Sequence, residues 1–377
     1  MAHVGEQAVE LLKDLIAIDS INPGLVPGAA GETAIVDFLT TRLQQAGFDV
    51  TVVQPEGRPE RPSIIAVPSG TSGGPTVVLN GHLDTVGVTG MDAPFTPRIE
   101  GNKLYGRGAA DMKGGVAGII AAAEHLVASQ APVRIVLALV ADEEDASVGS
   151  AAVINALADL SIDPTMCLIA EPTHLSISKS LRGFGIVKVT FPGIAGHSSQ
   201  PDLFVNAVTN LGRLLHAVDV RGQELQAVGA DLMVTVVNGG ISPFVIPDSA
   251  DCIVEMRTTP QQQGTQALAE VNALLDSEWN ATAELVLSRD GWHLQDSGPA
   301  RDFGHTLASQ LGTAIDFAAP YWMEAPMWER VCPTLICGPS GGGLHSIDEW
   351  VDLDQVRAFA DGLAAVLNNS TEQGSEN

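Results

Sequence analysis

The chain has 377 residues, of which 45% are hydrophobic, and its mean hydropathy is +0.18. Such a chain can bury a sizeable core and is too long for one ordinary domain, so we expect two folded domains rather than a disordered polypeptide. The 45 acidic residues outnumber the 19 basic ones, and the net charge of −26 disfavours nucleic acid or an anionic membrane as a partner.

The N-terminal segment, residues 1–18, lacks the charged start and the uninterrupted apolar core of a signal peptide, and its spacing predicts an amphipathic helix. No apolar run approaches the ~18 residues that a membrane-spanning helix needs. The four cysteines show no CxxC spacing and mostly lie inside apolar runs, which is typical of buried thiols. These features predict a cytoplasmic protein.

From the N-terminus to about Ser180 the pattern alternates between helix and strand. A helix is expected over residues 31–47, strands over 48–53 and 63–67, and an Ala-rich, largely apolar helix over 116–128. Because such a helix must be buried against a sheet, this region predicts an α/β sandwich.

Four apolar, strand-like runs in the sequence each end near a potential metal ligand. An apolar run without alternation predicts a strand that is covered on both faces, as in a parallel sheet. Open α/β sheets bind their ligands at the carboxyl ends of such strands, so we expect one site at one edge of one sheet. The runs and the residues that follow them are Thr76–Asn80 with His82 and Asp84, Arg134–Val140 with Asp142–Asp145, Met166–Ala170 with Glu171, and Pro333–Cys337 with His345.

The pattern changes near Leu181, where strands with partial alternation appear within residues 184–193, 231–240 and 250–260. Helices are expected over 202–218 and 261–276. These elements predict an α+β insert over residues 182–290, which interrupts a domain formed by residues 1–181 and 291–377.

The candidate ligands include two imidazoles and several carboxylates but no cysteine. This set suits zinc, cobalt or manganese, and bridging carboxylates favour two ions ~3.5–4 Å apart. A site for one ion would need fewer acids. The candidates are His82, Asp84, Asp111, Glu143, Glu144, Glu171 and His345.

The spacing of these residues indicates separate roles. His82 and Asp84 lie on one face of an extended segment, so Asp84 can orient the imidazole. Glycines around Asp111 let the backbone pass close to a crowded centre. Of the adjacent Glu143 and Glu144, one can bind metal while the other takes the proton from a water held by the metals.

Each motif also has a purely structural interpretation. The GHLD segment can be a turn, the acids at 142–145 a solvated turn or a helix N-terminus, and Glu171-Pro172 the start of a helix. The GPSGGG segment before His345 could cradle a phosphate, although no Lys-Ser/Thr pair follows it.

The sequence resembles the zinc peptidase family that includes acetylornithine deacetylase, succinyl-diaminopimelate desuccinylase, carboxypeptidase G and the aminoacylases. The resemblance covers nearly the whole chain. It implies an α/β/α catalytic domain with two zinc ions, interrupted by a smaller, ferredoxin-like α+β domain for homodimerisation. The matching segments, in family order, are GHLDTV, GRGAADMKGG, ADEED, AEPT, RGFGIVKVTFPGIAGHSSQP and GGLHSIDEW.

The resemblance also implies roles for the metal ligands. Asp111 bridges both ions, His82 and Glu171 bind the first, and Glu144 and His345 bind the second. Glu143 matches the general acid/base, and Asp84 is the residue behind His82. A Glu at 171 resembles the deacylases and carboxypeptidases, whereas aminopeptidases tend to have Asp there. Relatives carry a cis peptide bond after the bridging Asp, so we predict one at Asp111-Met112.

Further roles fall within the insert. By analogy, His197 reaches the active site of the partner subunit and polarises the scissile carbonyl. Arg257 matches a position that holds a substrate carboxylate, with a structural pairing to Glu255 or Asp251 as the alternative, and Arg182 is a second candidate for substrate binding. Phe244 stands where the family commonly has Asn, which implies a changed substrate pocket.

Glu324-Ala325-Pro326 resembles acetylornithine deacetylase most. The resemblance therefore implies an amidohydrolase that cleaves an N-acyl-L-amino acid. A dipeptidase or carboxypeptidase of the same family is the alternative, and a non-catalytic relative that only binds amino acids or partners is a third hypothesis.

Overall fold

A computed structural model of the protein describes residues 3–70, 76–131 and 133–369. The chain divides into two compact units. The first comprises Met1–Lys179, Leu294–Phe317 and Met323–Asn377, and the second comprises Ser180–His293 and Ala318–Trp322. Among the helices of the described residues, none is both long and apolar enough to cross a membrane.

The core of the first unit is a six-stranded sheet with the order β1-β2-β6-β3-β7-β17. Strands β6, β3, β7 and β17 are parallel to one another, whereas β2 is antiparallel to both of its neighbours, β6 and the edge strand β1. The four parallel strands are the four apolar runs that precede candidate ligands, which confirms that their ends meet at one edge of one sheet. Their bounds are β1 Phe48–Val53, β2 Ser63–Pro68, β3 Thr76–His82, β6 Arg134–Val140, β7 Met166–Ile169 and β17 Thr334–Ile336.

Helices bury both faces of this sheet. All residues of β3 are buried, and because successive side chains of a strand point to opposite faces, neither face is open to solvent. Helix α3 packs on β3 and β6 and also contacts α1 and α9, while α4 packs on β1, β2 and β6. The helices are α1 Val4–Ile16, α2 Thr33–Gln45, α3 Gly114–Ala128, α4 Val148–Asp159, α7 Pro299–Leu311, α8 Ala325–Trp328 and α9 Leu353–Asn369.

A second, smaller sheet in the first unit carries the segments around Asp111 and His345. Its strand order is β18-β19-β5-β4, and all neighbouring strands are antiparallel. The helical turn η1, Ala109–Lys113, contacts β19 and leads directly into α3. The strands are β4 Arg98–Glu100, β5 Lys103–Tyr105, β18 Gly341–Gly342 and β19 Trp350–Asp352.

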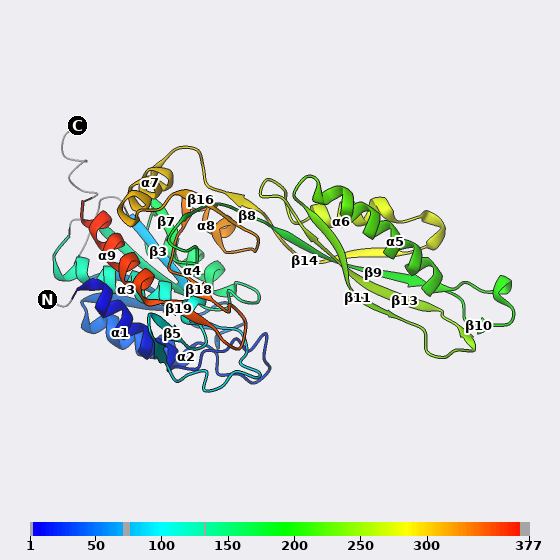
Figure 1. Ribbon diagram of the computed structural model, residues 1–377, viewed down its shortest axis with the longest axis horizontal. Coiled ribbons are helices and arrows are strands. Elements are labelled where there is room, and N and C mark those ends of the chain that lie inside the picture. The colour runs from blue at the N-terminus through cyan, green and yellow to red at the C-terminus, as the bar shows by residue number, and fades with distance from the viewer. Residues whose placement is uncertain (1–2, 71–75, 132, 370–377) are drawn as a thin grey trace. The chain divides into compact units, whose positions relative to one another are not determined.

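The second unit is built on an antiparallel sheet with the order β11-β13-β9-β14. Burial alternates along β9 and β13, so one face packs into a core that also contains residues of α5 and α6 (Figure 1). Strand β11 is an edge strand and is largely exposed. The bounds are β9 Phe184–Pro192, β10 Gly196–His197, α5 Ala207–Gln226, β11 Asp231–Gly239, β12 Val245–Ile246, β13 Ser249–Arg257, α6 Gln266–Leu274, β14 Thr282–Arg289 and β15 Trp292–His293.

Two strands, β8 (Ile177–Leu181) and β16 (Ile315–Ala319), carry the chain across the boundaries of the units. The architecture confirms the expected fold class, an α/β unit interrupted by an α+β unit. Helix α5, however, begins at Ala207 and not at Asp202. The Asn206 side chain accepts a hydrogen bond from the Thr209 N–H and caps the helix there, and the helix continues beyond Val218 to Gln226.

Candidate metal centre

Asp111 lies between two imidazoles that come from distant parts of the chain. Its Oδ1 is 3.2 Å from Nε2 of His82, and its Oδ2 is 3.2 Å from Nε2 of His345. His82 is the last residue of β3, and His345 follows the Gly-rich segment after β17. The φ of His345 is 60°, a left-handed conformation that non-glycine residues seldom adopt. One carboxylate therefore faces both histidines, the arrangement expected of a bridging ligand.

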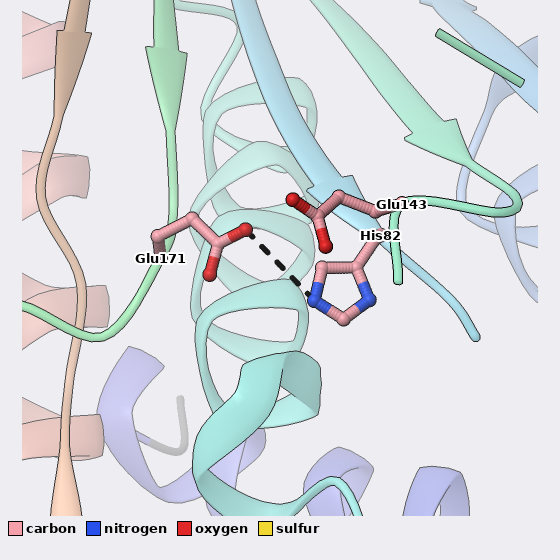
Figure 2. A group of neighbouring side chains, drawn as sticks. All are labelled: His82, Glu143 and Glu171. Atoms are coloured by element: carbon pink, nitrogen blue, oxygen red, sulfur yellow. Dashed lines mark ion pairs between the residues drawn. The ribbon is translucent and has the colours of Figure 1, made fainter. Parts of the chain in front are cut away.

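The remaining carboxylates surround this pair. Glu144 Oε2 lies 3.2 Å from Nε2 of His345, and Glu171 Oε1 lies 3.8 Å from Nε2 of His82. The possible ligand atoms of His82, Glu143 and Glu171 all lie within 4.8 Å of one another, and Figure 2 shows both carboxylates beside the imidazole. The structure thus brings together all five residues for which metal binding was predicted.

Asp84 is placed to orient both His82 and the acidic turn after β6. Nδ1 of His82 lies 3.0 Å from the carbonyl oxygen of Asp84 and 3.6 Å from its Oδ1. A carbonyl can only accept, so Nδ1 carries a proton, and Nε2 is the nitrogen that faces Asp111 and Glu171 and that a metal would bind. The Asp84 carboxylate also accepts the backbone N–H groups of Glu143 and Glu144, at 3.1 and 3.2 Å.

Glu349 is a site residue that reasoning from the sequence missed. Its buried carboxylate accepts the N–H groups of Gly108, Ala110 and Asp111 at 2.9 to 3.0 Å and pairs with Arg107 at 2.7 Å. It therefore fixes the backbone that presents Asp111. The Asp111-Met112 peptide bond is cis, as predicted. The only signal for Glu349 was its place four residues after His345, within the GGLHSIDEW segment.

Burial, mutual repulsion and hydrogen bonds shift the pKa values of these groups. Burial raises the pKa of Glu143 and of Glu171 well above the ordinary value, with further contributions from neighbouring carboxylates. Burial also lowers the pKa of His82, but hydrogen bonds to Asp111 and Asp84 outweigh it, so this pKa lies well above its usual value. Hydrogen bonds to Asp111 and Glu144 raise the pKa of His345 to about 10.

The cluster gathers more negative than positive charge. Four carboxylates and two imidazoles converge; burial together with this crowding raises the pKa of Glu143 and Glu171, and the neighbouring carboxylates raise the pKa of both histidines. Divalent cations would balance these carboxylates, and imidazole nitrogens with carboxylate oxygens form a donor set that suits zinc, cobalt or manganese. The four cysteines are buried and free, as expected, and burial raises the pKa of Cys167 and Cys337.

The other predicted site residues lie in the second unit. His197 is exposed, and its Nδ1 accepts the backbone N–H of Ser199 at 3.2 Å. Arg257 donates to Glu255 at 2.7 Å, the pairing that was considered as its structural alternative. Arg182 pairs with Asp231 at 2.8 Å and donates to two backbone carbonyls. Phe244 is 71% exposed.

Comparison with known proteins identifies the family to which this protein belongs. The model of Peptidase family M20/M25/M40 matches residues 78–369. Succinyl-diaminopimelate desuccinylase of Sphingopyxis alaskensis is 28% identical, over 94% of this chain and 97% of that protein. Acetylornithine deacetylase of Proteus mirabilis is also 28% identical, over 96% of each chain. A dinuclear metal-binding peptidase of Bacillus subtilis has the same fold, with a TM-score of 0.71 at 15% identity over 98% of this chain and 99% of that chain.

The metal-ligand chemistry of the cluster and these matches define a metal-dependent hydrolase of amide bonds. The chain belongs to peptidase family M20/M25/M40, whose matching members include both deacylases and peptidases.

Proposed function

We propose that the protein cleaves the amide bond of an N-acyl-L-amino acid and releases a carboxylate and the free amino acid. The observation that carries this proposal is the position of Asp111 between His82 and His345, with Glu143 beside the same centre. The two curated relatives with deacylase names support an acyl amino acid over a peptide. A Glu rather than an Asp at position 171 argues against an aminopeptidase and is compatible with a deacylase or a carboxypeptidase.

We assign the ligands to two zinc ions, which cobalt or manganese could replace. His82 and Glu171 would hold one ion, Glu144 and His345 the other, and Asp111 both, which agrees with the contacts each side chain makes. The ions would polarise the scissile carbonyl and lower the pKa of the attacking water. Asp84 and Glu349 would hold His82 and Asp111 in place.

Glu143 is the candidate proton carrier. Burial and Glu171 raise its pKa, which would make it a stronger acceptor for a proton from the attacking water, and it would then pass that proton to the leaving amine. Its backbone is fixed by Asp84, and its side chain lies beside His82 without an ion pair to a basic residue among those described.

The proposed substrate class can be tested on a panel of N-acetyl, N-formyl and N-succinyl L-amino acids together with dipeptides. We expect kcat/KM to be highest for an N-acyl amino acid, because the two curated relatives described above bear deacylase names. A preference for dipeptides would instead establish the peptidase alternative, and no turnover of any amide after metal loading would support the non-catalytic one.

Replacing Glu143 should remove chemistry and spare binding. For Glu143→Gln we expect kcat to fall ~10²–10⁴-fold with metal content unchanged, because the carboxylate is needed to move a proton. The matched control is Asp145→Asn, which alters an exposed carboxylate of the same turn and should keep full activity. Loss of metal from Glu143→Gln, with a normal rate when zinc is resupplied, would show that Glu143 is a ligand and Glu144 the base.

We further propose that the protein is a homodimer through its second unit and that His197 acts in the active site of the partner. Because the Ser199 N–H donates to Nδ1, the proton of the neutral His197 ring lies on Nε2, where it can donate to an oxyanion. Arg182, Arg257 and Phe244 would contribute to the substrate pocket, and Arg257 would have to exchange Glu255 for a substrate carboxylate.

The assignment of His197 to the partner site predicts complementation. A His197→Ala chain keeps its metal centre, and a Glu143→Ala chain keeps its His197, so mixed dimers should contain one working site. We expect activity to appear when the two inactive proteins are mixed and allowed to exchange subunits. If the mixture stays at the level of its parents although heterodimers have formed, His197 does not act across subunits.

A further inference from the structure

A network of buried polar side chains extends from Asp84 into the interior of the first unit. Asn22 is fully buried, and its Nδ2 donates to Asp84 Oδ2 at 2.7 Å and to Asp142 Oδ1 at 3.1 Å. One amide group therefore joins two carboxylates that would otherwise repel each other. The Asn22 Oδ1 accepts the N–H of Gly24 at 2.8 Å, which fixes the orientation of the amide.

Arg61 extends this network and supplies its positive charge. Its Nη1 lies 2.5 Å from Asp142 Oδ1, and its Nε and Nη2 donate to the two oxygens of Glu32 at 2.9 and 2.5 Å. The side chains of Arg61, Glu32 and Asp142 have no exposed surface. The planar guanidinium can bind two carboxylates in one fixed geometry, which a lysine ammonium cannot do.

The two carboxylates held by Asn22 belong to different parts of the metal centre. Asp84 follows β3 and faces the His82 imidazole, whereas Asp142 follows β6 and begins the turn that carries Glu143 and Glu144. Asp142 has a φ of 69°, a left-handed conformation that its surroundings must enforce. Strands β3 and β6 pair side by side up to His82 and Val140, so Asn22 joins their ends just beyond the last paired residues.

A contribution to the stability of the fold is a weak explanation for such a buried network. Replacing a buried ion pair with apolar residues of similar size is often neutral or stabilising, because the desolvation of the charges offsets their attraction. Metal centres, in contrast, depend on outer residues that fix the orientation of the ligands, and small misplacements of a site are costly.

We propose that Asn22 and Arg61 are positioning residues of the metal centre, which act through Asp84 and Asp142 to hold His82 and the Glu143-Glu144 turn in one fixed relation. The inference rests on the proposed metal-dependent function. Asn22 couples the two strand ends, and Arg61, anchored on Glu32, holds Asp142 in the conformation from which the turn departs.

The test compares zinc affinity with stability in Asn22→Leu and Arg61→Met. Zinc affinity is measured by competition with a chromophoric chelator, and the unfolding midpoint of the metal-free protein is measured alongside. We expect both variants to bind zinc ~10–100-fold more weakly, as is typical when residues that orient metal ligands are changed. At saturating zinc, kcat should fall more than KM rises, because the misplaced groups act on the chemical step.

A matched control separates positioning from general stability. Arg42 forms a bidentate pair with Glu124 at 2.7 and 2.8 Å, also within the first unit but away from the metal centre. Arg42→Met should lower the unfolding midpoint while leaving zinc affinity unchanged. If Arg61→Met does not fold, Arg61→Lys is the second variant. It keeps the positive charge but loses the planar guanidinium that contacts both Glu32 and Asp142, and it should still weaken zinc binding.

Folded Asn22 and Arg61 variants with the zinc affinity and kcat of the wild type would overturn the inference, whatever their stability. Failure of the wild-type protein to bind zinc, cobalt or manganese is a different result, because it would contradict the proposed function itself.

Discussion

The structure depends on one carboxylate that two imidazoles share. Asp111 presents one oxygen to His82 and the other to His345. The two histidines come from distant segments, because His82 ends β3 and His345 follows β17. The small sheet and Glu349 fix the backbone of Asp111, while the parallel sheet delivers His82, the Glu143-Glu144 turn and Glu171 at the ends of three adjacent strands. Both sheets must therefore form before the centre exists.

Electrostatics explains why such a cluster indicates a cation-binding site: without cations, its crowded carboxylates would repel one another and would not stabilise the fold. Two like charges ~4 Å apart repel by ~4 kcal/mol at an effective dielectric constant of about 20, and this centre gathers Asp111, Glu143, Glu144 and Glu171 in a buried space. Burial and the neighbouring carboxylates raise the pKa of Glu143, and hydrogen bonds to Asp111 and Glu144 raise that of His345. Two divalent cations would balance the same carboxylates and leave Glu143 free to carry a proton.

The parts of the site that lie in local sequence patterns could be predicted, and those that depend on long-range contacts could not. An apolar run without alternation identified each parallel strand, and the ligand that followed it was then fixed in space by the sheet edge. Glu349, Asn22 and Arg61 gave no such signal. A lone Asn or Arg in a sequence is typical of an exposed position. Only the fold shows that Asn22 lies between Asp84 and Asp142. Helix α5 begins at Ala207, later than the apolar pattern predicts, because the Asn206 side chain caps it there.

We propose that Asp111 bridges two ions. The decisive measurement is a crystal structure of the zinc-loaded protein with anomalous diffraction at the zinc edge. We expect two anomalous peaks ~3.5–4 Å apart. One should lie between Asp111, His82 and Glu171, and the other between Asp111, His345 and Glu144. A single peak that His82 and His345 share, or two peaks that Asp111 does not touch, would show that Asp111 is not a bridging ligand.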